Sequence, residues 1–213
     1  ARKALNVPLD ARIVALLPGT RQSVVEKHLP LFIETAVEIN DRLPGTLFIL
    51  SAPTSQLEQK YRSMVYELNR LRLWVRNEDG PMIIRVSDAA VISSGTATLE
   101  ATLAGTPYAG VYLTSPFTYH LVRNLATIDH VLIANILARR SIVREFIQGE
   151  ARPKEIAAEI ENLLTDGDYR TRMLKDFSEV ALLLGNPGAA GRVAASIVEF
   201  LQNATPRGWN DDE

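Results

Sequence analysis

The sequence contains no cysteine among its 213 residues. A disulfide framework, a thiolate metal site and a cysteine nucleophile are therefore excluded. No apolar run approaches the ~18 residues that a membrane-spanning helix needs, so the sequence predicts no transmembrane segment. The net charge is only -2, which gives the chain no overall attraction for nucleic acid. We therefore expect no nucleic-acid partner, and any anion site must be a local cluster.

Several catalytic motifs are also missing. The sequence has no HExxH zinc motif, no G-x-S-x-G nucleophile turn and no P-loop GxxxxGK[ST]. Its three histidines, His28, His120 and His130, are far apart in the sequence. We therefore expect no metal site and no bound cofactor.

What is present is an alternation of short apolar runs with amphipathic helical patterns. Such an alternation predicts a parallel sheet covered by helices on both faces and joined by right-handed crossovers. We therefore expect a doubly wound, Rossmann-like α/β domain. The expected strands are residues 12–17, 46–50, 71–75, 89–93 and 108–112, and the expected helices are residues 23–40, 55–69, 82–86, 97–104 and 119–125.

From Pro153 onward the pattern is helical only, over residues 153–165, 168–184 and 188–202. We expect three parts: a domain over residues 1–186, a C-terminal helix over 187–203 that crosses to another domain or subunit, and a tail over 204–213. The chain starts without methionine in a polar run, residues 2–6, that looks helical. We interpret it as a piece of a longer protein.

The most informative stretch runs from Ala89 to Pro107 and predicts a strand, a tight turn and a helix. In the turn, Ser94, Gly95 and Thr96 precede the helix. Gly95 permits a positive φ and a close backbone approach, and the free N–H groups of the helix start favour an anion. Glu100 follows on the same helix face, where a carboxylate could accept hydrogen bonds from the two hydroxyls of a ribose. The alternative is an ordinary helix cap followed by a solvated acid.

Two further segments carry candidate site residues. Gly19, Thr20 and Arg21 follow the first strand, so Arg21 is expected on the same edge of the sheet as Gly95, where a guanidinium can pair with a diphosphate. Asn135 and Gln148 lie among apolar residues between 130 and 150. The alternative for that segment is an amphipathic helix with its arginines solvated, namely Arg139, Arg140 and Arg144.

In order and spacing, these motifs resemble the C-terminal half of lipid-A-disaccharide synthase, a GT-B glycosyltransferase. The resemblance covers nearly the whole chain, and the combination of LLPGTR with SGTATLE is more specific than either piece. The matching segments are LLPGTR at 16–21, SDAAVISSGTATLEATLAGTP at 87–107, SPFTYHLVRNL at 115–125, ANILARRSIVREFIQ at 134–148 and GNPGAAGRVA at 185–194.

The resemblance implies half of a two-domain enzyme that holds the donor UDP-2,3-diacylglucosamine. The other half would supply the catalytic base, the site for 2,3-diacylglucosamine 1-phosphate and the membrane contact, on the cytoplasmic face of the inner membrane. It further implies inverting, metal-independent transfer, and no activity for this piece alone. Arg21 would bind phosphate, Gly95 and Thr96 would form the pyrophosphate turn, and Glu100 would hold the ribose. The other implied binding residues are Gly19, Thr20 and Ser94, with Asn135 and Gln148 lining the donor pocket.

The chain departs from the family pattern at three positions. Val24 stands where the family has an acid, Leu113 where it has a basic residue, and Ala134 where it has proline. These changes bear on how the donor sugar and its acyl chains are held, and leave open a relative that uses another sugar donor. Two other functions stay open as well: a UDP-sugar epimerase, and a nucleotide-binding module without catalysis.

Overall fold

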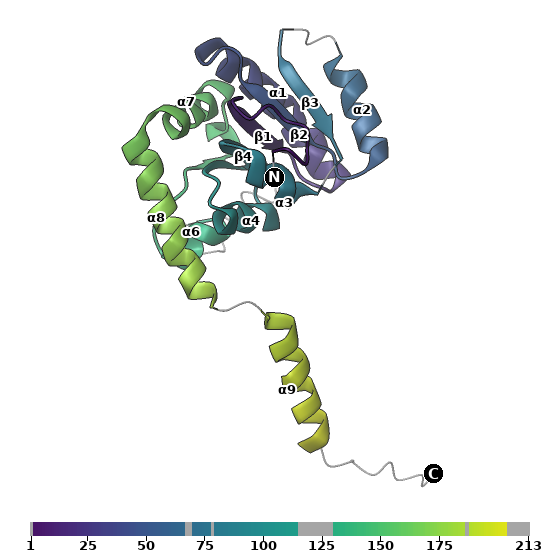
Figure 1. Cartoon of the computed structure of the whole chain (residues 1–213), viewed down its shortest axis with the longest axis vertical. Helices are drawn as coiled ribbons and strands as arrows, with labels where there is room; N and C mark the ends of the chain where they lie inside the picture. Colours follow the sequence, from purple (N-terminus) through teal and green to yellow (C-terminus); the bar gives the residue numbers. More distant parts are fainter. Residues whose placement is uncertain (1, 67–69, 78, 115–129, 186–187, 204–213) are drawn as a thin grey trace. The chain divides into compact units, whose positions relative to one another are not determined.

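The computed structural model describes residues 2–66, 70–77, 79–114, 130–185 and 188–203. The chain divides into two units, Ala1–Ala181 and Leu182–Glu213, which are described separately (Figure 1). The expected helix over 119–125 and the expected tail over 204–213 lie outside the described residues.

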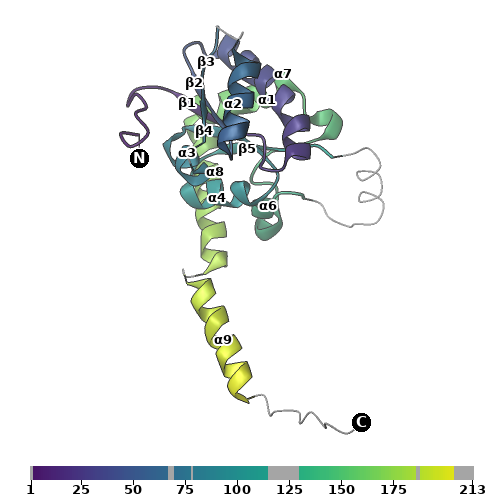
Figure 2. The ribbon, with the colours of Figure 1, turned by 90° about the vertical axis from the view of Figure 1, so that its right-hand side faces the viewer.

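The first unit is built on one six-stranded sheet with the order β3-β2-β1-β4-β5-β6, in which every neighbouring pair is parallel (Figure 2). The chain adds strands on one side of β1 and then returns to place β4 on its other side. The direction of winding therefore reverses between β1 and β4. The strands are β1 Ile13–Leu17, β2 Leu47–Ser51, β3 Arg72–Arg76, β4 Ala89–Ser93, β5 Tyr108–Tyr112 and β6 Glu145–Ile147.

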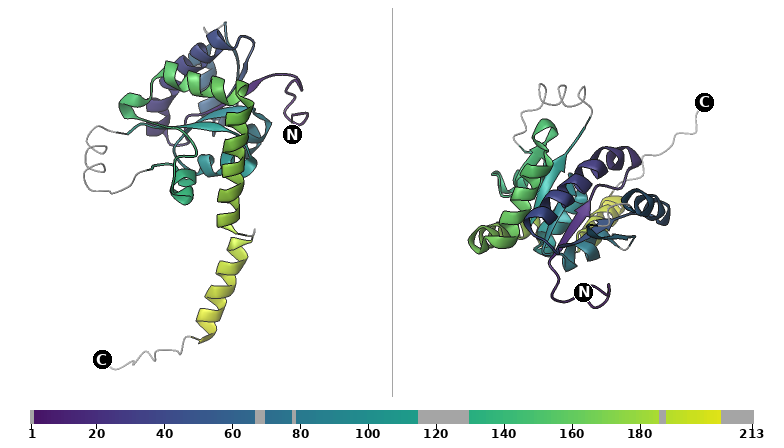
Figure 3. Two further views of the ribbon diagram at one scale, coloured as in Figure 1. Left: turned by 90° about the vertical axis from the view of Figure 1, so that its left-hand side faces the viewer. Right: turned by 90° about the horizontal axis from the view of Figure 1, so that it is seen from above.

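Helices cover both faces of this sheet (Figure 3). On one side α1 packs against α7, and on the other α3 packs against α4. The three central strands are buried along their whole length, which explains why they are continuous apolar runs without alternation. The helices are α1 Gln22–Arg42, α2 Ser55–Val65, α3 Gly80–Val86, α4 Thr96–Ala104, α6 Ile133–Ala138, α7 Pro153–Thr165 and α8 Gly167–Leu184, with α9 Ala189–Asn203 in the second unit.

The predicted doubly wound fold is confirmed, and the expected strands match β1 to β5 to within a residue or so. One alternative interpretation and one expectation were wrong. The segment 130–150 is not one amphipathic helix: it forms α6, then β6, then the 3-10 turn Gln148–Glu150. Arg139 ends α6 in a left-handed conformation, which divides the segment. The polar run at residues 2–6 forms turns rather than a helix.

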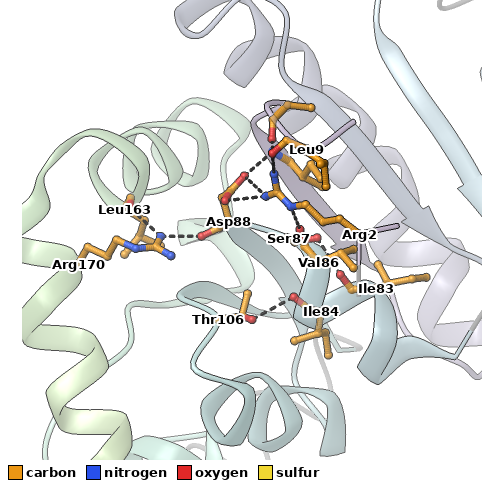
Figure 4. A network of polar contacts seen from close by, with 12 residues as sticks. Arg2, Leu9, Ile83, Ile84, Val86, Ser87, Asp88, Thr106, Leu163 and Arg170 are labelled. Atoms are coloured by element: carbon orange, nitrogen blue, oxygen red, sulfur yellow. Dashed lines mark hydrogen bonds and ion pairs between the residues drawn. The ribbon is translucent and has the colours of Figure 1, made fainter. Parts of the chain in front are cut away.

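The amino end of the sheet is closed by Asp88, the residue before β4 (Figure 4). Both oxygens of its carboxylate accept from the Arg2 guanidinium at 2.9 Å. One of these oxygens also accepts from the Ile13 amide at 2.8 Å, while the Asp88 amide donates to the Ile13 carbonyl at 2.8 Å. Arg170 of α8 donates to the Asp88 carbonyl at 2.6 Å. Asp88 thereby joins β1, β4, α8 and the N-terminal segment.

Candidate functional site

A cleft of about 330 Å³ lies at the carboxyl end of the sheet. It is formed where β1, β2, β3 and β4 end, so it includes the position at which the winding reverses. Open α/β sheets place ligands at this position, because loops on the two sides of the reversal diverge and leave a crevice. The lining residues are Leu17, Gly19, Thr20, Ser51, Pro53, Asn77, Asp79, Gly80, Pro81, Ser93, Thr96, Ala97 and Glu100.

The turn between β4 and α4 supplies backbone donors at this cleft. Gly95 is the N-cap of α4 and no side chain caps the helix there. The N–H groups of Gly95, Thr96 and Ala97 donate to no other residue in the described part of the chain. The Thr98 hydroxyl donates to the Gly95 carbonyl at 2.6 Å and fixes the turn. A helix start with free amides is suited to an anion such as phosphate.

Of the two expected reasons for glycine at position 95, the left-handed conformation was wrong. Its φ is 162°, an extended conformation that other residues also adopt, and not the left-handed region. A Cβ added there would meet nothing closer than the Ser93 carbonyl at 4.0 Å. The space next to the Gly95 backbone is therefore open, so that a ligand can approach the amides closely.

Glu100 lines the cleft from α4, one helical turn beyond Thr96. Its side chain is half-buried and makes no ion pair or hydrogen bond with another described residue. A carboxylate in this position is an acceptor without a protein donor, so it is available to a hydroxyl-bearing ligand.

The turn after β1 forms the opposite wall. Gly19 has a φ of +114°, and an added Cβ would lie 2.8 Å from Val24 Cγ1 and 3.2 Å from Ser93 Oγ. Glycine is therefore required here for both its conformation and its size. Gly19 and Thr20 line the cleft. Arg21 follows at the N-cap of α1, exposed and outside the lining, with no partner for its guanidinium in the described part of the chain.

Asn135 does not line this cleft. It is fully buried, its oxygen accepts from the amides of Ile142 and Val143 at 2.9 Å, and its nitrogen donates to the Val143 carbonyl and to Glu145 at 2.8 Å. Its amide group therefore holds the loop between α6 and β6, and in this structure it has no free hydrogen-bonding capacity for a ligand.

Gln148 and Ser94 are also occupied by backbone groups. Gln148 accepts from the Thr114 amide at 3.4 Å and donates to the Thr114 carbonyl at 3.2 Å. The Ser94 hydroxyl donates to the Val131 carbonyl at 3.3 Å. Neither residue lines the cleft, although both lie at the carboxyl end of the sheet.

His28 supports the same end of the sheet from inside. It is buried in α1, and its Nδ1 lies 2.8 Å from the Val24 carbonyl while its Nε2 accepts from the Leu113 amide at 3.2 Å. This pattern fits a neutral ring with the proton on Nδ1. Burial is the main cause that lowers the pKa of His28 below its ordinary value.

Sequence reasoning missed the wall contributed by β2 and β3. Ser51 and Pro53 follow β2, and Asn77, Asp79 and Gly80 follow β3. Asn77 donates to the Ser55 hydroxyl at 3.1 Å, and Asp79 is exposed at the start of α3. The signal was available, because polar residues directly after parallel strands all meet at one edge.

Two kinds of feature are absent from the residues that the structure describes. No group of three or more His, Asp or Glu side chains is placed to hold a metal ion there. No helix within those residues is long and apolar enough to cross a membrane.

The sequence matches the family model for lipid-A-disaccharide synthetase over residues 1–190. Curated relatives include the lipid-A-disaccharide synthases of Trichlorobacter lovleyi, 34% identical over 96% of this chain, and of Anaeromyxobacter sp. strain K, 37% identical over 94%. That of Neisseria gonorrhoeae is 33% identical over 86% of the chain. The chain spans about half the length of these relatives, 53%, 52% and 48% respectively.

Solved structures share the fold at low sequence identity. Anabaena HepE in complex with UDP-glucose aligns with a TM-score of 0.55 at 14% identity, covering 95% of this chain and 51% of that one. WaaG, a glycosyltransferase involved in lipopolysaccharide biosynthesis, aligns with a TM-score of 0.54 at 14% identity, covering 84% and 45%. A Listeria monocytogenes protein assigned as a UDP-N-acetylglucosamine 2-epimerase aligns with a TM-score of 0.60 at 15% identity, covering 92% of this chain and 46% of that one. At these identities the likeness concerns the fold alone.

Proposed function

The chain belongs to the lipid-A-disaccharide synthetase family, and from this premise we propose that it is the donor-binding half of a lipid A glycosyltransferase. In this proposal it holds UDP-2,3-diacylglucosamine while the diacylglucosaminyl unit passes to 2,3-diacylglucosamine 1-phosphate with release of UDP. The single observation that carries the proposal is the cleft at the reversal point of the sheet, with free amides on one wall and an unpaired carboxylate beside them.

The proposed seat for UDP uses groups that have no partner among the residues that the structure describes. The Gly95 and Thr96 amides bind the diphosphate, and the exposed guanidinium of Arg21 adds a positive charge from the turn after β1. Glu100 accepts from the ribose hydroxyls, one helical turn away. Gly19 and Thr20 provide the facing wall, which lies close enough to confine the diphosphate because residue 19 has no side chain.

This arrangement suits a reaction in which UDP is the leaving group. The bond between C1 of the donor sugar and the diphosphate oxygen breaks while a bond forms between C1 and the acceptor 6-hydroxyl oxygen on the opposite face, which inverts the configuration. Negative charge grows on the departing diphosphate, and fixed amides plus one guanidinium stabilise it without a metal ion. The hydroxyl proton passes to a base.

We assign that base, together with the acceptor site, to a second half of the protein. The curated relatives are about twice as long as this chain, and a donor domain of this kind works against a partner domain across a cleft. We further propose that the membrane contact belongs to that half, at the cytoplasmic face of the inner membrane, and that α9 crosses to it. This chain alone then binds UDP weakly and transfers nothing.

Calorimetry with UDP tests the proposed seat. Glu100→Ala and Arg21→Ala should each weaken binding by at least about tenfold, because each removes one charged contact of ~1.5–3 kcal/mol. Glu34→Ala is the matched control, since Glu34 is an exposed carboxylate of α1 outside the cleft. Unchanged affinity in both test variants would refute the assignment.

Product analysis separates the transferase from the epimerase that shares its fold. The epimerase alternative requires acid and base residues next to the donor sugar, whereas the family match favours transfer. Incubation of the full-length protein with UDP-N-acetylglucosamine should yield no epimer. Formation of the 2-epimer would contradict the proposal.

A further inference from the structure

The residues just before α6 are held to β6 by the nearly buried carboxylate of Glu145, which the proposed chemistry does not use, and the Ser94 hydroxyl links them to the turn between β4 and α4. Building on the proposed UDP seat, we infer that Glu145 is a positioning residue: it fixes Val131, whose carbonyl receives the Ser94 hydroxyl, and so sets the turn that offers its amides to the diphosphate.

Glu145 stands at the start of β6, and its side chain is 9% exposed. Its carboxylate accepts from the Val131 amide at 3.0 and 3.2 Å, from the Leu132 amide at 3.0 Å and from the Asn135 side chain at 2.8 Å. His130 Nδ1 lies 3.9 Å away. A carboxylate with several backbone donors holds those donors in one geometry, since any shift leaves a buried charge underbonded.

Leu132 makes the same segment sterically specific. It is buried against β5 at Gly110, where an added Cβ would lie 2.4 Å from Leu132 Cδ1. The side chain thus fills the place that a larger residue at position 110 would occupy. Leu132 packs against β5, and the amides of Val131 and Leu132 donate to Glu145 of β6. Together these contacts fix the position of Val131.

Ser94 links Val131 to the turn between β4 and α4. Its backbone amide donates to the Val111 carbonyl at 2.8 Å, which completes the pairing of β4 with β5, and its hydroxyl donates to the Val131 carbonyl at 3.3 Å. Because the hydroxyl hydrogen is used there, Ser94 cannot also donate it to a phosphate. Its contribution is therefore to hold the turn from behind, next to the free amides of Gly95 and Thr96.

A double-mutant cycle in UDP affinity tests the connection. If Glu145 acts through Ser94, then Glu145→Gln and Ser94→Ala should each weaken UDP binding about fivefold, and the double variant should also be about fivefold weaker. Residues that share one network show such non-additivity. Multiplied effects, about 25-fold in the double variant, or an unchanged affinity in Glu145→Gln, would overturn the inference.

Glu159→Gln is the control for a purely structural role. Glu159 is also a buried carboxylate, accepting from the Tyr169 hydroxyl at 2.7 Å, but it lies in α7 with no bond to the turn. The Glu159→Gln substitution should lower the melting temperature and leave UDP affinity unchanged. If it weakens UDP binding as Glu145→Gln does, the effect of Glu145 is general destabilisation and the inference fails.

A measurement on the unmodified chain covers the case in which Glu145→Gln does not fold. In an amide NMR titration with UDP, the Val131 and Leu132 resonances should shift together with those of Gly95 and Thr96. Shifts confined to the turn would overturn the inference while leaving the UDP seat intact. Absence of any UDP binding would overturn both.

Discussion

The two ends of the six-stranded sheet use their polar groups in opposite ways. At the amino end, Asp88 accepts from Arg2 and Ile13 and is itself held by Arg170, so its charge and backbone are fully engaged (Figure 4). At the carboxyl end, Glu100 and Arg21 have no partner within the described residues. Asp88 holds the fold together at one end, whereas Glu100 and Arg21 are left available to a ligand at the other.

This difference indicates how the site can be located without a bound ligand. Both ends carry acids and arginines, so composition does not distinguish them. What distinguishes Asp88 from Glu100 is that the Asp88 carboxylate is used within the protein, whereas the Glu100 carboxylate lines a cleft and bonds no other described residue, so it can accept from a ligand. Substitutions at the two ends should therefore separate stability from binding.

The largest effect is expected at the amino end. Asp88→Ala removes the acceptor of Arg2 and of the Ile13 amide, so it should lower the free energy of unfolding by about 3 kcal/mol. UDP affinity should stay unchanged below the melting transition. Asp10→Ala is the control, because Asp10 is exposed at the same end and makes no bond in the described part of the chain. Urea unfolding measures the stability of both variants, and equal losses of unfolding free energy in Asp88→Ala and Asp10→Ala would contradict the comparison.

Gly19→Ala should show that one residue of the carboxyl end is also structural. The new methyl group meets Val24 at 2.8 Å in a left-handed conformation, so we expect a loss of about 2 kcal/mol and weaker UDP binding. Gly45→Ala isolates the conformational part, since Gly45 has a φ of +80° and no atom within 4 Å of an added Cβ. A loss no larger than that of Gly45→Ala would show that close packing at Gly19 is unimportant.

Glu100→Gln should separate binding from stability at the carboxyl end. Replacing the charge with an amide should weaken UDP binding about tenfold, or about 1.4 kcal/mol. The free energy of unfolding should change by less than about 0.5 kcal/mol, because no group in the described part of the protein is bonded to this carboxylate. Thermal unfolding and calorimetry on the same sample check both values. A clear loss of stability would mean that Glu100 has a structural partner after all.

The smallest effect concerns pH. Burial lowers the pKa of His28 in the folded protein below its ordinary value of 6.5, so the unfolded chain binds the proton more readily. The stabilising contribution is complete above pH 6.5 and is lost as the pH falls below it. The free energy of unfolding should decrease as the pH is lowered from 7.5 to 5, and it should decrease less in the His28→Gln variant. An identical pH dependence in both proteins would contradict the neutral, hydrogen-bonded ring.

Much of this architecture was predictable from the sequence. The central strands are apolar runs ended by Gly or Ser, and the position of Glu100 after Thr96 follows from helix periodicity. The strand β6 was not predicted because it has only three residues, Glu145–Ile147, which is too short for a recognisable pattern. It forms through its pairing with β5. The resemblance placed Asn135 in the donor pocket. Its hydrogen bonds with Glu145 and the loop 141–143 depend on tertiary contacts, which the sequence does not reveal.

The most direct test is a crystal structure of this chain with UDP. The account predicts the diphosphate on the Gly95 and Thr96 amides, the ribose hydroxyls on the Glu100 carboxylate and the Arg21 guanidinium turned toward the phosphates. UDP bound elsewhere, or a Glu100 side chain directed away from the occupied cleft, would contradict it.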